Sequence, residues 1–181
     1  ATYGGEQLAR SGYAVIENIG YALATPAAND DCEGAAEIGK GYKAVLRVPH
    51  GCGTEATNVV RVQIPEGFYN VKPMPKAGWT IETKTRPLDT PVDSGHGFKI
   101  REAVTEVTWS GGRLENAHFD EFVLSMRLPN KPGATLYFPM VQTCEKGSNN
   151  WTGIPAAGQK WGDLPEPAPY IAVKKAVGHA H

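Results

Sequence analysis

Leu46-Arg47-Val48-Pro49-His50-Gly51-Cys52 and Tyr137-Phe138-Pro139-Met140-Val141-Gln142-Thr143-Cys144-Glu145-Lys146-Gly147 carry the strongest signal of the fold. Each is an apolar run that ends in a cysteine close to a glycine, a pattern typical of a strand that ends at the rim of a sheet. If Cys52 pairs with Cys144, the bond joins positions 92 apart, and the chain-entropy model then gives roughly 4–5 kcal/mol of stabilisation. Such a bond persists only where thiols are oxidised. The two stretches therefore indicate an exported protein.

Composition limits the classes of protein to consider. The chain has 181 residues, of which 41% are hydrophobic, so we predict one domain with a core of ordinary size. The net charge is −1, which gives no strong field to attract nucleic acid or anionic lipid. No apolar run is long enough to span a membrane, and the first residues lack the pattern of a signal peptide. We expect a periplasmic or extracellular protein whose signal peptide has been removed.

The pattern along the chain is that of short strands. Its 21 glycines and 14 prolines fall between segments rich in β-branched and aromatic residues. We predict an all-β protein, an immunoglobulin-like or cupredoxin-like β-sandwich. The candidate strands are 42–48, 59–64, 79–85, 105–109, 119–128, 135–144 and 171–173. We also expect an edge strand at 13–17, a short helix near 6–10, an acidic loop around 29–37 and a proline-rich segment, 162–169, extended over the surface.

Alternation of apolar and polar residues predicts which side chains face the core. In 119–128, the apolar residues Phe122, Leu124, Met126 and Leu128 occupy alternate positions, as on a half-buried strand. Gly111-Gly112 follows a predicted strand and favours a hairpin or a bulge. The predicted core is Val60, Val62, Ile64, Val107, Trp109, Phe122, Leu124, Leu136 and Phe138.

Motifs of known enzymes are missing from the sequence. It has no nucleophile elbow, phosphate-binding glycine loop or zinc-protease helix motif, so we predict that the protein is not an enzyme. Cys32 lies among acidic residues, which raise the pKa of a thiol and favour a free, unreactive cysteine.

Five histidines are candidate ligands for a metal. His50 is the better candidate, because it lies at the end of a strand that can hold it rigidly. His96 and His118 fit solvated loop positions. His179 and His181 either chelate a metal weakly or belong to a disordered tail or a tag remnant. Trp151 follows a Gly-Ser-Asn-Asn turn, and a bond between Cys52 and Cys144 would bring this turn toward His50. Trp151 therefore either adjoins His50 or is an ordinary core or rim aromatic.

Several separate motifs resemble the YcnI-like copper-binding proteins of bacteria. The motifs are Tyr42–Cys52, Val71–Trp79, Val107–Gly112, Leu136–Cys144 and Ile154–Gln159. The resemblance implies a β-sandwich, export across the inner membrane, a role in copper handling rather than catalysis, and a disulfide between Cys52 and Cys144 that leaves Cys32 out.

The resemblance also implies a copper site. In that family a histidine exposed by signal cleavage binds Cu(II) through its amine and imidazole, a strand-end side chain assists, and a tryptophan covers the metal. Here His50 falls near the assisting position and Trp151 matches the covering tryptophan. Tyr13 stands where the terminal histidine belongs, after an extension of about residues 1–12, and an insertion between residues 20 and 39 also departs from the family.

The resemblance, with its departures from the family pattern, leaves two candidate functions. The first is an exported protein of bacterial copper homeostasis that sequesters or delivers copper, with the metal ion and another copper-handling protein as its expected partners. Its site would be completed by His96, by His118 or by the Tyr13 phenolate, since one histidine alone is a weak site for Cu(II). The alternative is a metal-free β-sandwich interaction module that has lost the copper site. We expect no nucleic-acid partner and no membrane-spanning segment, with residues 162–181 forming a Pro-rich, His-containing tail.

Overall fold

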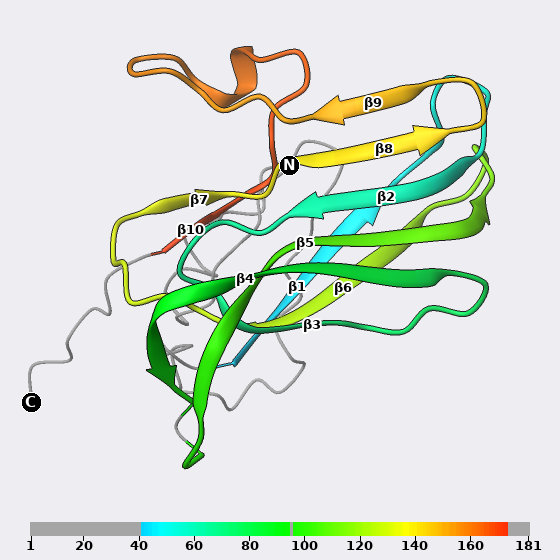
Figure 1. Ribbon diagram of the computed structural model, residues 1–181. Helices are drawn as coiled ribbons and strands as arrows, with labels where there is room; N and C mark the ends of the chain where they lie inside the picture. The colour runs from blue at the N-terminus through cyan, green and yellow to red at the C-terminus, as the bar shows by residue number, and fades with distance from the viewer. Residues whose placement is uncertain (1–40, 95, 174–181) are drawn as a thin grey trace, which may run out of the picture.

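The computed structural model describes residues 41–94 and 96–173, which form a β-sandwich (Figure 1). In this part of the chain there is no α-helix, every pair of adjacent strands is antiparallel, and one 3-10 turn, η1, covers Trp161–Asp163. The strands are β1 Gly41–Val48, β2 Thr57–Gln63, β3 Tyr69–Pro73, β4 Thr80–Asp93, β5 Lys99–Leu114, β6 Asp120–Arg127, β7 Thr135–Tyr137, β8 Met140–Cys144, β9 Ser148–Trp151 and β10 Tyr170–Ala172. The predicted all-β fold is confirmed.

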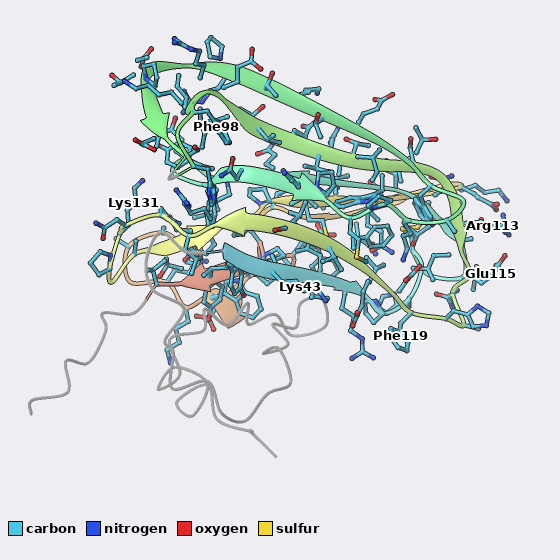
Figure 2. All side chains as sticks on the ribbon, turned by 90° about the horizontal axis from the view of Figure 1, so that it is seen from below. Lys43, Phe98, Arg113, Glu115, Phe119 and Lys131 are labelled. Atoms are coloured by element: carbon cyan, nitrogen blue, oxygen red, sulfur yellow. A yellow bond between two sulfur atoms is a disulfide. The ribbon has the colours of Figure 1, made fainter. Side chains whose placement is uncertain are left out.

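The strands form two facing layers and one small ladder. One layer has five strands in the order β4-β5-β2-β8-β9, and the other has three in the order β1-β6-β3, while β10 pairs with β7. Figure 1 shows the three-stranded sheet behind the five-stranded one. Side chains fill the space between the two layers (Figure 2). None of the described residues forms a helix long and apolar enough to cross a membrane.

The core lies between these two sheets and has the residues that the alternation predicts. All nine predicted core residues are buried, with no side chain more than 9% exposed. Aromatic rings occupy its centre: the edge of Phe122 meets Trp109 at a centroid distance of 5.4 Å and Trp79 at 5.1 Å. Such edge-to-face pairs add to the free energy gained from burial alone.

The predicted strand 135–144 is wrong as a single element, because it divides at Phe138-Pro139. β7 pairs with β10, whereas β8 pairs with β2 in the five-stranded sheet. Proline has no N–H to donate, so a ladder cannot continue through Pro139 unchanged. The Phe138 N–H donates to the carbonyl of Pro169 at 2.7 Å, and the Pro139 carbonyl accepts from Gln63 N–H at 2.9 Å. The chain therefore changes partners at this point.

Two predicted strands are much longer than the sequence pattern indicates. Segments 79–85 and 105–109 extend into β4 and β5, which form a long hairpin. β4 contains Pro87 and Pro91, which an edge strand tolerates. The ladder between β2 and β5 shifts register between Ser110 and Leu114, as a bulge or a similar irregularity at Gly111-Gly112 would cause. The predicted alternative of a hairpin at these glycines is wrong, because both lie inside β5.

Two other predictions need correction, and one strand, β3, was not foreseen. In the predicted Gly-Ser-Asn-Asn turn, the last three residues instead begin β9, because the chain turns earlier, at Glu145-Lys146-Gly147. The proline-rich segment does not simply lie on the surface, since Pro167, Ala168 and Pro169 are buried. Their backbone is bonded inward, with Ala168 N–H donating to the Gly153 carbonyl at 2.7 Å. The elements expected in residues 1–40 lie outside the described residues.

Candidate functional site

The site predicted around His50 lies at the rim where β1 and β8 end. After β1 the chain passes through Pro49 and His50 to Cys52, which is bonded to Cys144 at the end of β8. The predicted disulfide is therefore present, and Cys32 lies outside the described residues. Cys52 and Glu55 also exchange two backbone hydrogen bonds of 3.1 Å. A covalent bond and a tight turn thus fix the backbone next to His50.

Position 51 requires glycine because the backbone approaches it closely. A Cβ added to Gly51 would lie 1.8 Å from the carbonyl oxygen of Glu55, a distance that no side chain can occupy. The Gly51 N–H donates to Oδ1 of Asn116, from the loop between β5 and β6, at 3.1 Å. The turn that carries His50 is therefore fixed to a segment 65 residues away.

The imidazole of His50 is exposed, and its geometry defines the tautomer. Nδ1 lies 2.6 Å from the carbonyl oxygen of Gly51. A carbonyl oxygen can only accept a hydrogen bond, so Nδ1 carries the proton. In the neutral ring the lone pair is then on Nε2, the nitrogen through which such a histidine coordinates a metal.

A buried amide joins this turn to two strands. Gln142 on β8 is 0% exposed, and its Nε2 donates to the carbonyl of His50 at 2.7 Å and to Oγ1 of Thr57 at 2.8 Å. Its Oε1 accepts from Nδ2 of Asn149 on β9 at 3.1 Å. None of these amides was among the predicted site residues. Gln142 has the same inward parity on its strand as Met140 and Cys144, and this parity is a signal that the sequence contains.

Trp151 lies close to this buried amide along the sheet. It is paired with Met140, its side chain is half-buried, and it packs against the core. Asn149 precedes it by two residues on the same face of β9, a separation of about 7 Å along a strand. The structure therefore connects His50 to the strand of Trp151 through Gln142 and Asn149.

The outer surface of the rim is charged and partly aromatic. Arg113 is bonded to both Glu115 and Glu145, and its guanidinium holds the pKa of the Glu145 carboxyl below the usual value. The side chain of Phe119 is 56% exposed and lies under the guanidinium of Arg47, 4.3 Å from the ring centroid. Figure 2 shows Arg113, Glu115 and Phe119 together at this end of the molecule.

A comparison with known protein families places the chain in one of them. A family model described as "Domain of unknown function (DUF1775)" matches residues 32–173. The chain belongs to the DUF1775 family. The match includes all of β1–β10, the disulfide and the buried amide. No curated protein matches the chain.

A solved structure shows the type of sandwich that this DUF1775 domain forms. It is described as the crystal structure of an uncharacterized protein from Nocardia farcinica that reveals an immunoglobulin-like fold. The two chains are 22% identical, the alignment covers 90% of this chain and 99% of the other, and the TM-score is 0.55. Of the two predicted sandwich types, the immunoglobulin-like one is therefore the type found.

The other candidate ligands occupy different positions in the domain. His118 lies at the same rim, in the turn before β6, where its N–H donates to the Glu115 carbonyl at 3.0 Å. His96 lies beyond the start of β5, whose 16 residues separate it from the rim by roughly 50 Å of strand. His96 therefore does not complete a site with His50. Tyr13, His179 and His181 lie outside the described residues.

Metal-binding side chains are not concentrated in the part of the chain that the structure describes. In residues 41–94 and 96–173, no group of three or more His, Cys, Asp or Glu side chains is placed to hold a metal ion. The side chains bonded to the backbone beside His50 are the amides of Asn116 and Gln142. The described part of the rim thus holds the His50 imidazole on a fixed backbone.

Proposed function

We propose that this DUF1775 protein is an exported, YcnI-like copper-binding protein that sequesters or delivers Cu(II) in bacterial copper homeostasis. The observation that carries the proposal is His50, an exposed imidazole on a disulfide-bonded rim with its proton on Nδ1. Imidazole is a good ligand for Cu(II). A disulfide linking distant strands suits an oxidising compartment such as the periplasm or the cell exterior.

In this proposal His50 binds the metal through Nε2. The remaining ligands come from water, from His118 or from residues outside the described part of the chain, with Tyr13 first among them. Trp151 is the tryptophan proposed to lie over the metal. Since only neutral imidazole coordinates, binding is expected to weaken in acid.

The test is a titration of Cu(II) into the protein lacking His179 and His181, followed by tryptophan emission. We expect quenching that His50→Ala abolishes and that His96→Ala, a matched control far from the rim, leaves unchanged. Equal affinity for His50→Ala and His96→Ala would contradict the site. If the full chain binds Cu(II) and the protein lacking His179 and His181 does not, the metal is on the tail.

The second candidate is a metal-free interaction module. It is favoured by the neutral character of the side chains bonded to the backbone of His50 and Gly51, which are the amides of Gln142 and Asn116. If the protein without its tail histidines binds no Cu(II), this candidate replaces the first. A partner would then use the rim surface around Phe119, so Phe119→Ser is the variant that should weaken its binding.

A further inference from the structure

We propose that Gln142 and Asn116 are positioning residues that clamp the peptide between His50 and Gly51 and so fix the imidazole for metal binding. The proposal rests on the proposed copper function for its binding readout. Its structural part concerns the metal-free protein and can be tested separately.

The clamp acts on both polar groups of one peptide unit. The carbonyl of His50 accepts from Gln142 Nε2 at 2.7 Å, and the N–H of Gly51 donates to Asn116 Oδ1 at 3.1 Å. These partners lie 92 and 65 residues away in sequence, on β8 and on the loop between β5 and β6. A peptide plane held at both sides cannot rotate without breaking one of the two bonds.

The orientation of the Gln142 amide follows from its partners. The His50 carbonyl can only accept, so the nitrogen of the amide faces His50 and its oxygen faces the Asn149 amide. The second N–H of that nitrogen donates to Thr57 Oγ1. Both donors are thus engaged, and a buried side chain with every donor satisfied has one well-defined position.

The peptide in turn determines where the ring points. His50 Nδ1 donates to the carbonyl of Gly51, the next one along the chain. This carbonyl belongs to the residue that follows the clamped peptide, so release of the clamp frees Gly51 to shift relative to the ring and weakens the bond that places the proton on Nδ1. Residues that orient a ligand in this way commonly change metal affinity roughly 10- to 100-fold when they are replaced.

Two variants test the clamp, each with a matched control. Gln142→Met keeps the length of the side chain and removes its hydrogen bonds, and the exposed strand glutamine gives the control Gln63→Met. Asn116→Ala removes the other bond from a less buried position, with the exposed Asn130→Ala as control. Circular dichroism and the disulfide mass check that each variant is folded.

The first measurement uses metal-free protein at a pH where the imidazole is neutral. Nitrogen NMR shifts of the His50 ring report which nitrogen carries the proton. We expect wild type and both controls to show protonated Nδ1, and the two clamp variants to show a mixture of tautomers. A ring that stays in the Nδ1-protonated form in both clamp variants would overturn the proposal, whatever copper does.

The second measurement is Cu(II) affinity in the same proteins without His179 and His181. We expect each clamp variant to bind roughly 10- to 100-fold more weakly than its control. If wild type binds and His50→Ala does not, but both clamp variants bind normally, the clamp is wrong and the copper site stands. If wild type binds no Cu(II) but the tautomer mixture appears, the copper function is wrong and the clamp stands.

Discussion

The two ends of the sandwich each present a histidine in a turn, and they are built in different ways. At the disulfide rim, the peptide after His50 is bonded to residues 65 and 92 positions away, and Cys52 is covalently bonded to Cys144. At the tip of the β4–β5 hairpin, the His96 N–H donates to Ser94 Oγ at 3.1 Å, and the Ser94 N–H donates to the carbonyl oxygen of Phe98 at 3.0 Å. Figure 2 shows Phe98 at the end opposite Arg113 and Glu115.

This contrast in hydrogen bonding indicates which of the two turns is suited to hold a ligand. In the described residues, the hydrogen bonds given above for the hairpin tip join positions only two to four residues apart, so they define its local shape. Contacts between distant segments fix the rim relative to the whole core, and such pre-organisation is what a binding site needs. A histidine at the rim is therefore a candidate for function, whereas one at the hairpin tip is a solvated loop residue.

Removing the disulfide should have the largest effect. For Cys52→Ser with Cys144→Ser, we expect the free energy of unfolding to fall by roughly 4–5 kcal/mol, because a bond between residues 92 apart restricts the unfolded chain. Denaturant unfolding of the double variant and wild type measures the loss. A loss of less than about 1 kcal/mol in the free energy of unfolding would contradict this difference between the two ends, since the rim would then be held no more firmly than the hairpin tip.

A glycine at each end gives the second test. Gly51→Ala places a Cβ against the Glu55 carbonyl, and such overpacking costs about 1–3 kcal/mol or more. In Gly97→Ala the added Cβ meets open space, so the expected loss of stability comes only from backbone strain at a φ of 80°. Such strain costs about 1 kcal/mol. Thermal unfolding of both variants checks this order, and a larger loss for Gly97→Ala would reverse the comparison.

Replacing a buried hydroxyl is the third test. Thr57→Val leaves one N–H of the buried Gln142 without its acceptor, which should cost about 1–3 kcal/mol. The exposed Thr90 on β4 provides the matched control, because Thr90→Val should change stability by less than about 0.5 kcal/mol. Equal denaturant midpoints for the two variants would show that the buried amide network does not stabilise the rim.

Much of the fold could be predicted because it depends on local periodicity. Phe122 and Leu124 reveal a half-buried strand by their spacing alone. The two cysteine-ended stretches allow the bond between Cys52 and Cys144, but only the family resemblance implies it. Pairing between strands is less visible in sequence. β9 begins Ser148-Asn149-Asn150, residues that favour turns, and it is a strand because β8 offers it a partner.

The site could be predicted only in part, for the same physical reason. His50 was identifiable from its place at a strand end, but its hydrogen-bonding partners are distant in sequence and come together only in the folded chain. Gln142 could have been found as a polar residue at an inward position of an apolar strand. Nothing in the local pattern indicates that its amide reaches the carbonyl of His50.

A fourth test uses pH at the end of β1 away from the rim. Burial raises the pKa of the Tyr42 hydroxyl above its ordinary value of 10.0. Above pH 10 the unfolded chain ionises while the folded one stays neutral, so stability should fall by up to about 1.4 kcal/mol per pH unit. Tyr42→Phe should remove this part of the fall. Unfolding midpoints at pH 8 and 11 measure it, and identical losses for wild type and Tyr42→Phe would contradict it.

The smallest effect is expected from the ion pairs on the surface of the rim. The guanidinium of Arg113 lowers the pKa of Glu145, first through a direct hydrogen bond and then through its charge. Arg113→Ala should therefore return that pKa toward its ordinary value, as carboxyl NMR titration can show. Both side chains face solvent, where screening makes such pairs weak, so the unfolding midpoint at pH 7 should barely move. A loss as large as that of Thr57→Val would mean that surface charge, rather than buried polar contacts between distant segments, distinguishes the rim from the hairpin tip.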